Sequence, residues 1–72
     1  MKTTFKVIKA RNKKYNNKIF TVENCKIVAD VIRFENFDFN NKKYSGNIYK
    51  TNATMYSGNQ STIQFDVIEI LN

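Results

Sequence analysis

FKVIKA at residues 5–10 and FDVIEI at residues 65–70 are near copies of one another, and they stand close to the two ends of a 72-residue chain. The two hexapeptides differ chiefly in charge. The first carries Lys6 and Lys9, whereas the second carries Asp66 and Glu69. Opposite charges on facing residues stabilise paired strands by about 0.2–1 kcal/mol, so the two segments are suited to lie side by side.

An antiparallel register with Phe5 opposite Ile70 matches each of these lysines with an acid. It sets Lys6 against Glu69 and Lys9 against Asp66. A parallel register with Phe5 beside Phe65 also opposes charges, so the direction of pairing stays open from the sequence alone. In either direction the terminal strands are adjacent, which removes two exposed edges from a small sheet.

The apolar residues of both hexapeptides change face midway. Phe5 and Val7 lie on one side of a strand, whereas Ile8 and Ala10 lie on the other, and the second copy repeats the change. Such a strand is apolar on both faces, or it bends through a bulge where a barrel turns its corner. The pattern therefore predicts a sheet that closes or curls strongly.

Five segments rich in β-branched and aromatic residues are separated by breaks that contain asparagine or glycine. They are residues 3–10, 18–22, 25–34, 44–55 and 62–71. The third has a helical alternative capped by Asn24, but its β-branched residues favour a strand. We expect tight hairpins at Glu23 and Asn24 and at residues 57–60, and a longer loop over residues 35–43.

These elements predict an all-β fold with residues 1–72 in one small domain. The expected architecture is a five-stranded barrel or a strongly curled antiparallel sheet, SH3-like or OB-like, with the terminal strands adjacent. No sequence motif ties the chain to a named family. A chain this short buries only about 60% of its unfolded surface, so its stability rests on packing or on a homo-oligomer, and both remain open.

Catalysis and cofactor binding are not expected. The chain has no histidine and a single cysteine, Cys25, which excludes an internal disulfide and a zinc-type ligand set. Two glycines twelve residues apart, Gly46 and Gly58, cannot form a glycine-rich phosphate loop. We therefore expect no enzymatic activity, no cofactor and no metal.

Neither a signal peptide nor a membrane span is expected. The N-terminal residues lack a long apolar segment, and the longest apolar run of the chain is Ile27, Val28 and Ala29. That run is far shorter than a membrane-spanning segment requires. We expect a cytoplasmic protein that does not contact the membrane.

The positive charge is concentrated near the start of the chain. Residues 1–18 hold seven basic residues and no acid (+7), whereas residues 19–72 hold five basic and six acidic residues (−1). The densest part is expected to form the loop between the first two strands. Its candidate nucleic-acid-binding residues are Lys9, Arg11, Lys13, Lys14, Tyr15 and Lys18, since phosphates require cations and bases stack on aromatic rings.

A second candidate group lies within residues 34–44 and comprises Lys42, Lys43 and Tyr44. If Phe37 and Phe39 were exposed they could stack on unpaired bases, and if they were buried they would plug one end of the barrel. The buried arrangement is favoured because so small a core needs large apolar side chains. Tyr44, which follows two lysines, is the aromatic residue that we expect to face a ligand.

The leading hypothesis is a non-catalytic nucleic-acid-binding barrel, with single-stranded DNA or RNA slightly preferred because no helix is expected to enter a major groove. One alternative is a phage or mobile-element protein that binds and inhibits a host protein. Another is the subunit of a structural homo-oligomer. The richness in lysine and asparagine is also what an AT-rich gene produces, so charge alone does not decide between them.

Overall fold

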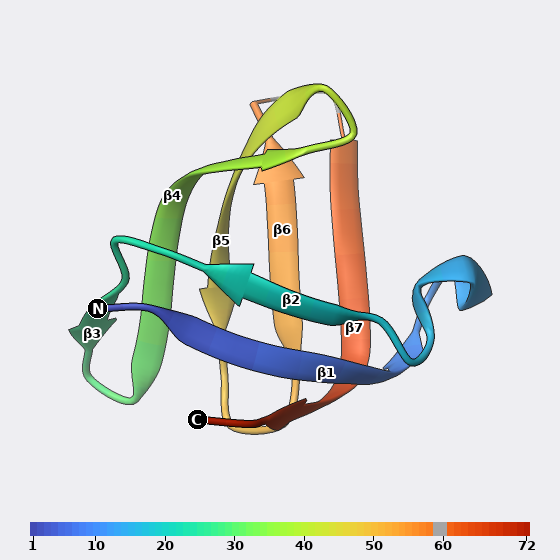
Figure 1. The fold of residues 1–72 in the computed structure, drawn as a ribbon, viewed down its shortest axis with the longest axis horizontal. Helices are drawn as coiled ribbons and strands as arrows, with labels where there is room; N and C mark the ends of the chain where they lie inside the picture. Colours follow the sequence, from blue (N-terminus) through green and yellow to red (C-terminus); the bar gives the residue numbers. More distant parts are fainter. Residues whose placement is uncertain (59–60) are drawn as a thin grey trace.

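Seven antiparallel strands form one sheet in the computed structural model, which describes residues 1–58 and 61–72. The strands are β1 (Thr3–Ala10), β2 (Ile19–Val22), β3 (Lys26–Val28), β4 (Val31–Phe39), β5 (Lys42–Ile48), β6 (Ala53–Ser57) and β7 (Ser61–Ile70), with a 3₁₀ helix η1 (Lys13–Tyr15) after β1. Their spatial order is β2-β1-β7-β6-β5-β4-β3. The sheet curls into a half-barrel in which β1 and β2 run across the direction of β5, β6 and β7 (Figure 1). The predicted all-β, strongly curled antiparallel fold is confirmed.

The two hexapeptides pair as neighbours inside the sheet, as its second and third strands from the β2 edge. β1 and β7 are antiparallel, with Phe5 opposite Ile70 and Lys6 opposite Glu69, which is one of the two registers that the charge pattern allowed. The predicted pairing of Lys9 with Asp66 is wrong. The register shifts on both sides of Lys9, which therefore lies opposite Val67. These shifts are the bulge that the change of apolar face indicated.

The sheet has seven strands where five segments were expected, because two of those segments contain turns without glycine or proline. Residues 25–34 are not one strand. They fold back at Ala29, whose φ is 55°, so that β3 pairs with the start of β4. Residues 44–55 likewise fold back after β5, where the Tyr49 amide donates to the Asn52 carbonyl at 2.7 Å.

Residues 35–43 do not form the expected loop. β4 continues through them to Phe39, with a register shift near Asn36, whose φ is 58°. The chain then reverses through Asn40 and Asn41, whose φ values are 53° and 62°. Two positive φ angles in a two-residue turn are typical of a type I′ hairpin, which asparagine tolerates.

The hairpin expected at Glu23 and Asn24 is also absent from the structure. The strands on either side of it, β2 and β3, do not pair but form the two opposite edges of the sheet. The chain crosses between these edges, and there the Cys25 amide donates to the Met1 carbonyl at 2.8 Å. β6 and β7 do pair, down to Ser57 opposite Ser61, while residues 59–60 of the second predicted hairpin lie outside the described residues.

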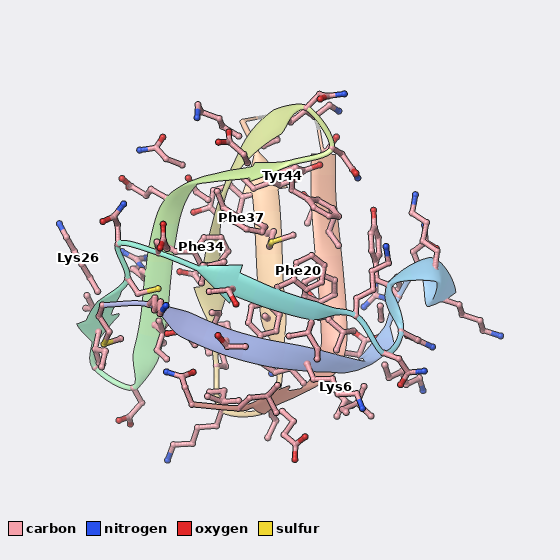
Figure 2. All side chains as sticks on the ribbon, in the orientation of Figure 1. Lys6, Phe20, Lys26, Phe34, Phe37 and Tyr44 are labelled. Carbon is pink, nitrogen blue, oxygen red and sulfur yellow. The ribbon has the colours of Figure 1, made fainter. Side chains whose placement is uncertain are left out.

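Aromatic rings from both halves of the sheet fill the interior (Figure 2). The Phe20 ring of β2 lies 5.6 Å from the Phe5 ring and 5.3 Å from the Phe65 ring, measured between centroids. Phe37 and Phe39 pack against this core, which confirms the prediction that they are used as core residues. The core therefore anchors the edge strand β2 to β1 and β7.

Candidate nucleic-acid interface

Asparagine side chains and backbone bonds fix the loop between β1 and β2. The Asn12 side chain accepts a hydrogen bond from the Lys14 amide at 3.2 Å, which caps η1. The Asn16 side chain accepts from the Ala10 amide at 2.7 Å, which holds the loop against the end of β1. Lys13 and Lys14 are held on this short turn with exposed side chains. The predicted basic loop is thus an ordered segment that holds Lys13 and Lys14 at the surface.

Tyr15 and Tyr44 do not present their rings to a ligand, contrary to expectation. Tyr15 is 6% exposed and Tyr44 is 3% exposed. Both rings pack against Phe39, at centroid distances of 5.9 Å and 6.0 Å. A core this small needs large buried rings, so Tyr15 and Tyr44 pack in the core although they lie within basic segments of the sequence.

A hollow of about 560 Å³ lies beside the predicted basic loop, and Arg11 is the one predicted cation that lines it. The first loop and the start of β7 form most of its wall, and Tyr44 of β5 completes it. Its lining residues are Arg11, Asn12, Tyr15, Tyr44, Ser61, Thr62, Ile63 and Gln64. The Lys42 ammonium reaches the same wall, because it donates to the Ser61 hydroxyl at 3.1 Å. We call this site the basic hollow.

Tyr15 and Tyr44 both line the basic hollow, although each is almost fully buried. The other uncharged polar lining residues are Asn12, Ser61, Thr62 and Gln64. Hydroxyl and amide groups of this kind donate to phosphate oxygens or to sugars.

Two of the candidate cations already have acidic partners. Arg11 pairs with Asp66 at 3.4 Å, and Lys43 pairs with Asp38 at 2.9 Å. These are the ion pairs formed among residues 1–58 and 61–72, and both lie at the surface, where such pairs contribute little to stability. The remaining candidate lysines, Lys9, Lys13, Lys14, Lys18 and Lys42, have no described carboxylate within 4.0 Å.

None of the predicted lysines is among the lining residues of the basic hollow. Lys9 and Lys18 are exposed where the loop leaves β1 and enters β2, but neither is among the residues of the hollow. Lys14 lies above the ring of Tyr15, with its ammonium 5.1 Å from the ring centroid. This contact directs one lysine toward the tyrosine that forms part of the hollow.

Sequence reasoning missed the polar wall that β7 supplies. Ser61, Thr62 and Gln64 lie about fifty residues from the basic loop in the sequence and carry no charge or motif. Gln64 is held in place because its side-chain oxygen accepts from the Thr54 hydroxyl at 2.6 Å. The signal that could have placed this wall beside Arg11 was the predicted β1–β7 pairing, extended by one residue beyond Ala10.

Comparison of the chain with family models, with curated proteins and with solved structures found no match. Among the described residues no helix has the length and apolarity needed to cross a membrane. The same residues contain no group of three or more His, Cys, Asp or Glu side chains placed to hold a metal ion. The site is therefore interpreted from its own geometry.

Proposed function

We propose that the protein is a non-catalytic nucleic-acid-binding domain that contacts phosphates through the basic hollow and the lysines around it. The observation that supports this proposal is the convergence of two basic segments, distant in sequence, on one polar hollow. Lys13 and Lys14 come from the acid-free segment 1–18, and Lys42 comes from the start of β5. A phosphate chain that follows these groups would meet several cations, and the nearby Asp66 is already paired with Arg11.

The arrangement favours contact with the backbone of the nucleic acid over contact with its bases. The rings of Tyr15 and Tyr44 are buried, so neither can stack on a base without leaving the core. The polar side chains that line the hollow, among them Asn12, Ser61 and Thr62, suit phosphate or sugar oxygens. The protein is accordingly expected to bind with little dependence on sequence.

Replacing Lys13 and Lys14 together with alanine tests this proposal. Each lost phosphate contact should flatten the slope of log affinity against log salt by about one unit, and we expect affinity to fall by roughly tenfold at low salt. Fluorescence anisotropy with short single-stranded and duplex oligonucleotides measures both quantities. A matched control replaces Lys26 and Lys50, which are exposed but lie away from the basic hollow.

The control should leave affinity and salt slope nearly unchanged. If both double variants weaken binding equally, the attraction comes from net charge and the basic hollow is not the site. A dissociation constant weaker than about 100 μM for every oligonucleotide at about 150 mM salt would be ordinary non-specific attraction and would overturn the proposal.

A further inference from the structure

On the side of the barrel away from the β1–β7 pairing, two strand edges face a groove of about 270 Å³. One wall comes from the end of β2 and the residues after it, and the other comes from the second half of β4, which runs along the same side of the molecule (Figure 1). The groove is lined by Thr21, Glu23, Asn24, Glu35, Asn36, Phe37 and Asp38. We call it the seam. The Phe20 ring packs against those of Phe37 and Phe39 at 6.2 Å and 5.3 Å, which joins the two walls from inside.

The edge of β2 that faces the seam has unpaired backbone groups. The described strand β2 pairs with β1 alone. The Val7 amide donates to the Lys18 carbonyl at 2.8 Å. This bond identifies Val7 and Lys18 as a hydrogen-bonded pair of the β1–β2 ladder. Because bonded and non-bonded pairs alternate in an antiparallel ladder, Phe20 and Val22 bond to β1 whereas Thr21 turns its amide and carbonyl outward. Thr21 is also one of the residues that line the seam.

The second half of β4 has a free edge of the same kind. β3 covers only the first part of β4, since the last pair between them is Lys26 with Arg33. On the other side the two-residue turn makes Phe39 and Lys42 a bonded pair, so Phe37 bonds to β5 and Asp38 does not. The amide and carbonyl of Asp38 therefore point away from β5, and Asp38 lines the seam.

Three carboxylates surround these unpaired groups. Glu23, Glu35 and Asp38 all line the seam and are exposed, so half of the six acids in a chain of net charge +6 are found at one groove. Only Asp38 has a cationic partner among the described residues, the exposed Lys43. Because the described acids form no group that could hold a metal ion, the complementary ligand is one with several separated positive charges.

We propose that the seam binds an extended, lysine- or arginine-rich segment of a partner protein by strand addition. The backbone of that segment would pair with the free groups of Thr21 and Asp38, and its cationic side chains would meet Glu23 and Glu35. An added strand satisfies the unpaired edges of both walls, whereas the three carboxylates of the seam repel the phosphates of a nucleic acid. The residues of the seam and those of the basic hollow do not overlap, so this site stands independently of nucleic-acid binding.

Amide hydrogen exchange measured by NMR on the intact protein tests the proposal. The probe is an acetylated and amidated octapeptide of alternating lysine and threonine. We expect the amides of Thr21 and Asp38 to exchange rapidly in the free protein and to slow by about tenfold or more at saturating peptide. Unchanged exchange of both amides at millimolar peptide, or slowing confined to the other edge strand β3, would overturn it.

Two controls separate strand pairing from attraction between charges. The same peptide with its threonine nitrogens methylated keeps every charge but loses backbone donors, so it should bind much more weakly; equal binding would overturn strand addition. Replacing Glu23 and Glu35 with glutamine should weaken the lysine peptide by about threefold to tenfold. An unchanged affinity would show that the acidic wall does not select the partner.

Discussion

The β1–β7 boundary and the seam are two places where the curled sheet could close, and only the first is closed. At the β1–β7 boundary the charges are of opposite sign, with Lys6 opposite Glu69 and with Arg11 paired to Asp66 at 3.4 Å. At the seam the three carboxylates that line the groove are of one sign. Apolar contact does not distinguish the two sides, because Phe20 packs against rings of both.

The two places differ in the sign of their charges, but charge alone does not decide which strands pair. Lys26 lies opposite Arg33 in the β3–β4 ladder, which forms although these two charges are alike. Each facing pair contributes only about 0.2–1 kcal/mol, so the aromatic core sets the stability and the charges add a small bias. The edges of β2 and β4 that face the seam remain unpaired, although the aromatic core packs beneath them.

Removing the ring that joins the two sides should have the largest effect. Phe20→Ala deletes a side chain that is 6% exposed and contacts rings on both sides, so we expect unfolding free energy to fall by about 3–5 kcal/mol. Urea denaturation followed by circular dichroism measures this loss. Its control is Ile19→Ala on the same strand, where 59% exposure limits the expected loss to about 0.5 kcal/mol. Equal losses would mean that β2 is not anchored by Phe20.

A smaller loss is expected where β5 packs closely against β4 and β6. A Cβ atom at Gly46 would lie 2.5 Å from the Phe34 ring and 2.5 Å from the Thr54 carbonyl oxygen. Gly46→Ala must therefore displace a backbone group, and it should destabilise the fold by about 1–3 kcal/mol. Ser45→Ala, the neighbouring control, should cost less than about 0.5 kcal/mol in the same denaturation experiment. A neutral Gly46→Ala would contradict this close packing.

The smallest effect concerns the charges that face each other across β1 and β7. Lys6→Glu places like charges opposite one another and should destabilise the fold by about 0.2–1 kcal/mol. Adding Glu69→Lys restores opposite signs and should recover part of that loss. A double-mutant cycle isolates the interaction, because the two side chains face each other in the register. A purely additive cycle would show that these two charges add no bias to this pairing.

The β1–β7 pairing could be predicted from the sequence because the two hexapeptides carry matching apolar residues and opposite charges. Phe5 and Lys6 occupy the predicted register, but Lys9 does not, because a bulge shifts the pairing by an amount that alternation cannot specify. The turn at Ala29 could not be recognised in the sequence, because the residue that adopts the positive φ is an alanine and not a glycine or an asparagine. The Asn40 and Asn41 turn carried a recognisable asparagine pair, but the surrounding phenylalanines were interpreted as part of a loop.

The sequence predicted that the lysines of the candidate site are exposed, but it did not predict that the aromatic rings beside them are buried. Lysines reach solvent wherever the chain places them, so Lys13 and Lys14 could be assigned to the surface from sequence alone. Whether Tyr15 faces solvent depends on Phe39 and Phe65, which come from other strands. Burial of an aromatic ring is a property of the assembled sheet.

The position of β7 also determines when this fold can form during translation. β7 lies between β1 and β6, yet it follows all the other strands in the sequence. A nascent chain that has emerged only as far as β6 holds a β1–β2 hairpin and a β3–β6 meander, with no strand to join them. Cooperative folding must therefore wait until residues 61–70 leave the ribosome, and until then the inner faces of both halves remain without their common partner.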